Sequence, residues 1–222
     1  MRHIDALSTQ SNDSKSKSCY YIFKRFFDII FSILMIICLA PILLIVSIIA
    51  SIDTKGSPFF TQDRIGRFDI PFKIYKIRTM STNAPSDIAT HMLKHPERYI
   101  SPVGEFFRRT SIDELPQLFN VLKGDMSFIG PRPVVLTETD LIGLRHENGA
   151  SSVRPGITGL AQVSGRDTVT ISEKARLDSE YAKNYSLKMD VCILIKTALQ
   201  VVHSEGIVEG ENKSISDVKK DK

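Results

Sequence analysis

The pattern of apolar and polar positions is dominated by one uninterrupted apolar run near the N-terminus. Residues 29–52 contain no charged residue and consist mainly of Ile, Leu, Val and Met. The run starts just after Arg25 and Asp28 and ends just before Lys55. A membrane helix needs about 20 apolar residues, so the run predicts a helix that enters a bilayer. The run is too long for a signal peptide, and no small-residue cleavage site follows it.

A proline interrupts this run near its middle. Pro41 follows Ala40, and a proline inside a helix removes one backbone hydrogen bond and usually causes a kink. One interpretation is a bent helix that crosses the bilayer once. The other is a re-entrant helix that turns at Ala40 and Pro41 and returns to the face it entered. Basic residues flank both ends of the run, which a one-way span does not explain well.

The remaining pattern divides the chain into four parts. Residues 1–20 are polar and predict a flexible tail, 21–54 the membrane helix, 55–204 a compact domain, and 205–222 a charged C-terminal tail. Within the domain, we expect short strands at 59–60 and 72–77 around a turn with Gly66, and helices at 86–98, 112–122, 172–184 (with Ser172 as N-cap) and 188–203. The fold class is therefore α+β, mainly helical. The last helix either packs in the core or lies on the membrane surface.

Composition excludes several classes of protein. The chain has 222 residues, 24% of them charged and 42% hydrophobic, which is typical of one globular domain rather than a disordered chain. A net charge of +4 without basic and aromatic interleaving argues against nucleic acid as a partner. The three cysteines have no CxxC spacing, so neither a zinc site nor a disulfide framework is indicated.

Two adjacent carboxylates, Asp113 and Glu114, are the main candidates for chemistry. Ser111 and Glu114 have the spacing of a capping box, although Pro116 fits better if Asp113 is itself the cap. In either case the pair lies near a helix N-terminus, whose dipole favours ionised carboxylates. An ionised Asp can attack phosphorus, and an Asp–Glu pair can bind Mg²⁺. The alternative is a plain helix cap with a surface ion pair.

Three basic groups are candidates for binding phosphate. Arg132 lies between two prolines, whose rigidity lowers the entropy cost of aiming its guanidinium at an anion. Lys76 and Arg78 would share one face of a strand. Arg154 begins a glycine-containing loop that could bring backbone N–H groups to a phosphate. Each group also has an ordinary structural interpretation, as a turn, a solvated strand face or a loop.

Taken together, these segments resemble the bacterial sugar transferase family, the small monotopic phosphoglycosyl transferases that initiate polysaccharide and glycoconjugate synthesis. The resemblance covers about residues 21–204. The matching segments are 62–66 (QDRIG), 76–80 (KIRTM), 110–118 (TSIDELPQL), 120–127 (NVLKGDMS), 130–133 (GPRP), 154–159 (RPGITG) and the region of Asp190.

The resemblance implies roles for individual residues. Asp113 would be the catalytic nucleophile with Mg²⁺ beside it, and Glu114 would assist. Arg108 and Arg132 would hold phosphate groups. The apolar segment would be the re-entrant helix of the family. Members often have Ser-Pro at the break, where this chain has Ala40 and Pro41.

The reaction implied is transfer of a sugar 1-phosphate from a UDP-sugar to polyprenyl (undecaprenyl) phosphate through a phosphosugar–aspartate intermediate, with release of UMP. The expected location is the bacterial inner membrane, with the catalytic domain on the cytoplasmic face and in contact with membrane lipids. A homo-oligomer is compatible with the sequence, and the sugar is not specified by it. The alternatives are a non-catalytic single-pass membrane protein that binds a partner, and a different phosphotransferase that uses an aspartyl-phosphate, such as a phosphatase.

Overall fold

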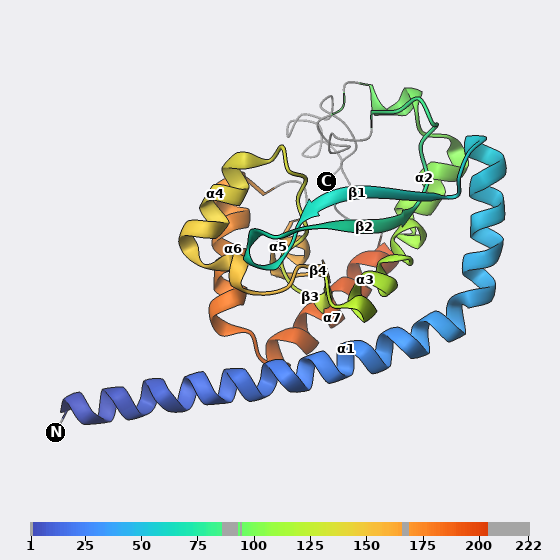
Figure 1. The fold of residues 1–222 in the computed structure, drawn as a ribbon. Coiled ribbons are helices and arrows are strands. Elements are labelled where there is room, and N and C mark those ends of the chain that lie inside the picture. Colours follow the sequence, from blue (N-terminus) through green and yellow to red (C-terminus); the bar gives the residue numbers. More distant parts are fainter. Residues whose placement is uncertain (1, 86–92, 94, 166–168, 204–222) are drawn as a thin grey trace.

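The computed structural model describes residues 2–85, 93, 95–165 and 169–203. For residues 2–18 and 201–203 it describes the backbone only. Helices predominate and two small sheets accompany them, in agreement with the prediction (Figure 1). The elements are α1 Arg2–Thr54, β1 Phe59–Ile65, η1 Arg67–Asp69, β2 Pro71–Ile77, η3 Pro96–Arg98, α2 Pro102–Arg109, η4 Ile112–Glu114, α3 Gln117–Lys123, β3 Ser127–Ile129, α4 Thr139–Asn148, η5 Ala150–Ser152, β4 Gly156–Thr158, α5 Leu160–Val163, α6 Ile171–Asn184 and α7 Leu187–His203.

The apolar run belongs to one long helix, α1. Among the described residues, α1 contains the one segment long and apolar enough to cross a membrane, Cys19–Thr54. The helix starts at Arg2, so residue 20, the predicted end of a polar tail, is no boundary of secondary structure. Helical backbone also continues through Ala40 and Pro41. The helix therefore bends without being broken into two helices, and its light-blue C-terminal part turns toward β1 (Figure 1).

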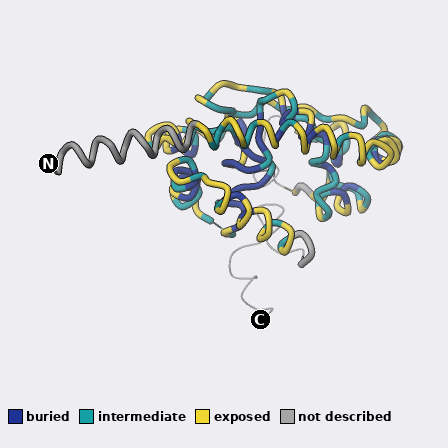
Figure 2. The backbone as a smooth tube through the Cα atoms, turned by 90° about the horizontal axis from the view of Figure 1, so that it is seen from below, coloured by how far each residue is buried: buried dark blue, intermediate teal, exposed yellow. Residues whose placement is uncertain are grey.

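α1 contacts the rest of the protein near both ends of its apolar run. Near the first end, the Arg25 guanidinium donates to the carbonyl oxygens of Val121 and Leu122, at 2.6 and 2.9 Å. Near the second end, Ser101 Oγ donates to Asp53 Oδ2 at 2.5 Å. Between these contacts many apolar residues of α1 are exposed. Figure 2 colours exposed residues yellow along the backbone. Both ends of the run therefore lie against the same folded domain.

The hairpin of β1 and β2 confirms the predicted strands around Gly66. The strands pair antiparallel in a register that places Phe60 opposite Lys76 and Gln62 opposite Ile74. Gly66 is required at the turn because a Cβ there would lie 2.8 Å from the Ile70 carbonyl oxygen. The hairpin lies over α3, and the Asn120 side chain joins the two by accepting from the Tyr75 N–H and donating to the Lys73 carbonyl.

A second, parallel sheet joins β3 to β4 and fixes the loop that follows β3. Ser127 pairs with Gly156, and Ile129 with Thr158. The backbones approach so closely that a Cβ on Gly156 would lie 2.1 Å from the Gly130 nitrogen. The glycines of the 154–159 segment therefore allow two loops to pack together. They are explained here without a phosphate ligand.

The core consists of several small clusters beneath the hairpin and between the helices. Each brings together residues far apart in the sequence: Val46, Ala50, Ile77 and Phe107; Ile129, Val163, Tyr181 and Ile193; Ile74, Val121 and Met126; and Val134, Leu141 and Ala175. The first cluster buries part of α1 against β2 and α2. One face of the apolar helix is thus used for packing within the protein.

The helices α6 and α7 match the predicted helices at 172–184 and 188–203, except for the residue that caps α6. α6 begins after Thr170, whose Oγ1 accepts from the Glu173 N–H at 3.3 Å, so Thr170 and not Ser172 is the N-cap. In α7, Ile193 is buried, whereas Leu194 and Ile195 are 46% and 57% exposed. This helix therefore packs on the core by one face and presents apolar side chains on another. Most of the predicted helix at 86–98 lies outside the described residues, and η3 occupies its end.

Candidate active site

The dyad lies in a short 3₁₀ turn between two helices. Asp113 and Glu114 belong to η4, which follows α2 and precedes α3. Ser111 has a left-handed backbone with φ of 56°, and its side chain makes no capping hydrogen bond. Glu114 N–H donates instead to the Ser111 carbonyl oxygen at 3.2 Å. The expected capping box is therefore wrong. The alternative that made Asp113 the helix cap is also wrong, because Pro116 precedes the first residue of α3.

Asp113 is buried, with 7% of its surface exposed. Its pKa is raised to about 6, chiefly by burial and also by the neighbouring Glu114 carboxylate, against the opposing positive charges of Lys76 and Arg108. The sequence argument expected the helix dipole to favour the ionised carboxylate, so it missed the dominant effect. The dipole is weak beside the cost of removing a charge from water. Even so, a pKa near 6 leaves most of the carboxylate ionised at neutral pH.

Glu114 connects the dyad to two cations. Its Oε1 accepts from Lys76 Nζ at 2.8 Å and lies 3.4 Å from Arg132 Nη2. The Lys76 and Glu114 side chains are each 17% exposed, whereas Arg132 is 51% exposed. Arg132 is thus the member of this group that is most open to a ligand.

Of the other two predicted phosphate-binding arginines, Arg108 lies near the dyad and Arg78 contacts the start of the hairpin. Arg108 lies in the last turn of α2, its Nε donates to Thr79 Oγ1 at 2.9 Å, and its charge acts on Asp113. Arg78 lies beyond the end of β2, where its Nε donates to the Ser57 carbonyl oxygen at 2.8 Å. The structure therefore places Lys76, Arg108 and Arg132 around the dyad and gives Arg78 a contact with the start of the hairpin.

The loop that carries Arg132 is held at successive backbone groups. Gly130 N–H donates to Thr158, and the Pro131 carbonyl accepts from Gly156 N–H, both at 2.9 Å. The carbonyl oxygen of Arg132 accepts from Arg145 Nη1 at 2.9 Å. The backbone is fixed while the Arg132 side chain projects toward Glu114, which is the rigidity expected from the two flanking prolines.

Two arginines that stabilise this loop were missed by the sequence reasoning. Arg145 Nη2 forms a buried ion pair with Asp178 at 2.6 Å, and Arg64 Nη1 donates to the Pro133 carbonyl oxygen at 3.2 Å. Arg145 lies in a helix for which the sequence offers no distinctive motif. Arg64 lies in the QDRIG segment, which matched the family but indicated no role for this arginine.

Arg154 and Asp190 lie at the junction between α1 and the domain. Asp190 is 4% exposed, and its carboxylate accepts from Tyr20 and Tyr181 hydroxyls at 2.7 and 2.9 Å and from Lys24 Nζ at 2.6 Å. Arg154 donates to the Tyr21 hydroxyl. Neither residue has a contact with the dyad among these interactions, and both serve to attach α1.

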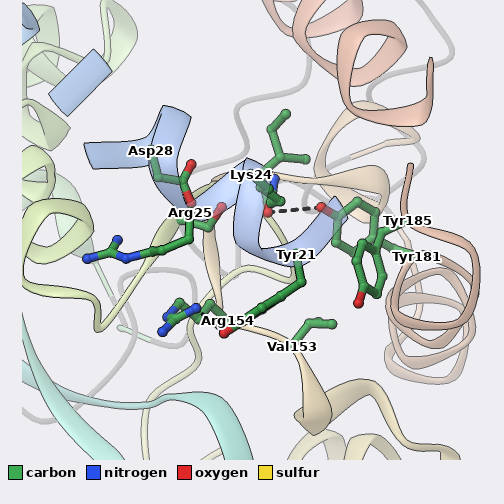
Figure 3. Close-up of a pocket in the computed structure, with 10 residues that line it drawn as sticks. Tyr21, Lys24, Arg25, Asp28, Val153, Arg154, Tyr181 and Tyr185 are labelled. Atoms are coloured by element: carbon green, nitrogen blue, oxygen red, sulfur yellow. Dashed lines mark hydrogen bonds between the residues drawn. The ribbon is translucent and has the colours of Figure 1, made fainter. Parts of the chain in front are cut away.

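A small cavity occurs at this junction. Its lining includes Tyr21, Lys24, Arg25 and Asp28 of α1 together with Arg154, Tyr181 and Tyr185, which Figure 3 labels. Its volume is about 20 Å³, enough for little more than one water molecule. It is too small for a nucleotide sugar. The candidate site remains the dyad, with the half-exposed Arg132 beside it.

The dyad offers oxygen ligands suited to a magnesium ion. Mg²⁺ is usually held by one or two carboxylates together with substrate phosphates and water. Asp113 and Glu114 provide these carboxylates, and a cation would offset the cost of burying the Asp113 charge. The described residues include no cluster of three or more His, Cys, Asp or Glu that could hold a metal. The remaining ligands would therefore be water and phosphate.

Comparison with known proteins agrees with the motifs. Residues 19–204 match the family model described as bacterial sugar transferase. This chain belongs to the bacterial sugar transferase family. The resemblance drawn from the sequence motifs is therefore confirmed.

The relatives of this bacterial sugar transferase include proteins of two sizes. It is 37% identical to the exopolysaccharide production protein ExoY of Sinorhizobium fredii, over 82% of this chain and 87% of the relative. It is 37% identical to the undecaprenyl-phosphate galactose phosphotransferase of Salmonella typhimurium, over 90% of this chain. It is 38% identical to the UDP-glucose:undecaprenyl-phosphate glucose-1-phosphate transferase of Klebsiella pneumoniae, over 85% of this chain. The chain spans 44% and 42% of the latter two.

Proposed function

We propose that this protein transfers a sugar 1-phosphate from a UDP-sugar to undecaprenyl phosphate, as the first membrane step of surface polysaccharide or glycoconjugate synthesis. The observation that carries this proposal is the buried Asp113 beside Glu114, with Lys76, Arg108 and Arg132 around them. The names of the Salmonella and Klebsiella relatives support this class of donor and acceptor.

The proposed reaction proceeds in two displacements at one phosphorus atom. A carboxylate oxygen of Asp113 attacks the sugar-bearing phosphorus, the bond from that phosphorus to the bridging oxygen breaks, and UMP leaves with the electron pair. A phosphate oxygen of the polyprenyl phosphate then attacks the same phosphorus. The Asp113 carboxylate leaves, and the product is a polyprenyl diphosphosugar.

The charged residues around the dyad are suited to this chemistry. Negative charge on the transferring group must be stabilised by fixed cations, because phosphoryl transfer depends mainly on positioning and electrostatics. Arg132 projects from a fixed backbone, and Arg108 acts on Asp113 from the end of α2. Lys76 holds Glu114 at 2.8 Å and favours the ionised form of Asp113. Bound Mg²⁺, held by Asp113 and assisted by Glu114, would supply further positive charge for the phosphates.

We further propose that α1 is a re-entrant membrane helix and that the domain lies on the cytoplasmic face. Residues 29–52 would extend roughly 36 Å as a straight helix, longer than the ~30 Å hydrocarbon core of a bilayer. A straight crossing would carry Arg25 and Asp53 to opposite faces. Both residues contact the same domain, at Val121 and at Ser101, so a crossing would break one of these contacts.

The exposed apolar face of α7 supports a domain seated on the membrane surface. Val191, Leu194 and Leu199 are 45%, 46% and 55% exposed and recur at helical spacing. This helix is also joined to α1 through Asp190 and Lys24. A site near the membrane surface would suit a reaction between one soluble and one membrane-bound substrate.

The proposal is tested by assaying the purified protein with Mg²⁺, undecaprenyl phosphate and a panel of UDP-sugars, with UMP release as the readout. We expect UMP release that depends on the lipid phosphate for repeated turnover and that one or a few sugars support. Hydrolysis of the donor without need for the lipid would indicate a phosphatase instead. Absence of turnover with every donor would support the non-catalytic alternative.

A further inference from the structure

Arg64 is a largely buried cation beside the candidate active site. Its Nη2 donates to Gln62 Oε1 at 2.5 Å and its Nη1 to the Pro133 carbonyl oxygen at 3.2 Å. Its Nε is buried and has no hydrogen-bond partner among the residues that the structure describes. Burial, and then the nearby charge of Arg132, lower the pKa of Arg64 to about 10. The guanidinium is still charged at neutral pH, but its surroundings disfavour that charge.

Arg145 holds the same loop, but its buried charge is neutralised by a carboxylate. Arg64 and Arg145 donate to successive carbonyl oxygens, those of Pro133 and Arg132. Arg145 is neutralised by Asp178 at 2.6 Å. No carboxylate of the described residues forms an ion pair with Arg64, although Glu114 and Glu138 act on it from a longer distance.

A buried charge in a folded protein is normally paired, because leaving it alone costs several kcal/mol. If Arg64 only held the loop, a neutral donor or a compensated pair such as Arg145 and Asp178 would do so at lower cost. Arg64 also lies close enough to Arg132 for the two charges to repel each other. Two neighbouring guanidinium groups form a region suited to a phosphate or diphosphate group.

We propose that Arg64 is a positioning residue whose buried charge, together with that of Arg132, creates the binding region for the diphosphate of the nucleotide donor. This inference rests on the proposed function. Arg64 holds the Pro133 carbonyl, which fixes the loop carrying Arg132, and its charge acts on the bound anion without direct contact by Nε. Gln62 keeps the guanidinium oriented from the same strand.

Binding of UDP to the full-length protein, measured by calorimetry in detergent at low and high salt, tests the inference. Arg64→Gln removes the charge but keeps an amide that can donate to Pro133, and Arg64→Lys keeps the charge. We expect Arg64→Gln to raise the Kd of UDP roughly tenfold or more and to weaken its salt dependence, because one charge-assisted interaction is lost. Arg64→Lys should bind within about threefold of wild type.

Arg67→Gln is the matched control. Arg67 lies three residues further on, also donates to a loop carbonyl, that of Ser152 at 2.7 Å, and stacks on Tyr21 away from the dyad. Its loss changes the net charge equally and should leave the Kd of UDP within about twofold, since the charge is remote from the anion. For uridine, which has no phosphate, the Kd should be the same in wild type and in both Arg64 variants.

The outcomes separate the inference from the function on which it rests. A wild-type protein that does not bind UDP contradicts the proposed function itself. A folded Arg64→Gln that binds UDP as tightly as wild type overturns the inference alone and reduces Arg64 to a loop support. If Arg64→Gln does not fold, Arg64→Lys decides: near wild-type affinity with an unchanged salt dependence supports the inference, and a tenfold loss overturns it.

Discussion

Lys76 Nζ lies 2.8 Å from Glu114 Oε1 and so joins strand β2 to the turn that carries the dyad. The two residues are 38 positions apart in the sequence. Both side chains are 17% exposed, and the charge of Lys76 is the largest influence opposing the effect of burial on Asp113. One lysine thus holds Glu114 in place and keeps its neighbour ionised.

The first prediction concerns the pH dependence of this arrangement. In the wild type, kcat/KM should fall as the pH drops through about 6, because the pKa of Asp113, raised mainly by burial, is about 6 and the protonated acid cannot attack. Lys76→Met should move this acid limb to higher pH, since the positive charge that favours ionised Asp113 is gone. Lys76→Arg, which keeps the positive charge, should show a smaller shift of the acid limb than Lys76→Met. Identical acid limbs in wild type and Lys76→Met, at saturating Mg²⁺, would contradict the assignment.

The second prediction concerns Arg132. Arg132→Ala should lower kcat/KM on the order of 10²-fold while the unfolding temperature changes little, because the side chain is half exposed and projects from a fixed backbone. The control is Arg176→Ala, an equally exposed arginine that also pairs with glutamates, on α6. Near wild-type turnover in Arg132→Ala would show that the Pro-Arg-Pro turn is only structural.

The third prediction concerns membrane topology. Single cysteines at positions 15 and 57, in a variant with Cys19, Cys38 and Cys192 replaced by Ser, should both be protected from an impermeant reagent added to intact cells. The reason is that both ends of the apolar run contact one domain, through Arg25 and Asp53. Both positions should react after the cells are opened. Labelling of one position in intact cells, with the other protected, would mean a true span.

The fourth prediction concerns the attachment of α1. Asp190→Asn should destabilise the folded protein by about 3–5 kcal/mol, because Lys24 would be left as a buried charge without its partner. Lys24→Met combined with Asp190→Asn should recover part of this loss. Thermal unfolding in detergent gives the comparison. A single variant as stable as wild type would show that the ion pair contributes nothing to holding α7 on α1.

The sequence predicted what depends on local pattern. The apolar run predicted the helix of residues 29–52, and the turn at Gly66 predicted the hairpin. The prediction failed at Ser111, where a left-handed residue replaces a capping box. A dipeptide of carboxylates does not reveal the backbone path that leads into it.

The sequence could not predict interactions that depend on tertiary packing. The ion pair of Arg145 with Asp178 joins two helices, and the network of Asp190 joins α7 to α1. The pKa of Asp113 depends on how deeply the turn is buried, which no spacing of residues specifies. Lys76 and Arg132 meet at Glu114 for the same reason, although the motifs had indicated each of them separately.

The central claim is that Asp113 forms a covalent bond to the phosphosugar, and the most direct measurement is the intact mass of the protein after rapid mixing with Mg²⁺ and the UDP-sugar, without lipid. Asp113 and Glu114 are adjacent in a 3₁₀ turn, so their side chains point about 120° apart and only one can attack a given phosphorus. We expect release of up to one UMP per enzyme and an added mass equal to the phosphosugar. Asp113→Asn should show neither, because an amide is a poor nucleophile. Normal turnover with lipid in the absence of any burst or adduct would contradict the claim, and would indicate direct transfer in a ternary complex with Asp113 as a metal ligand.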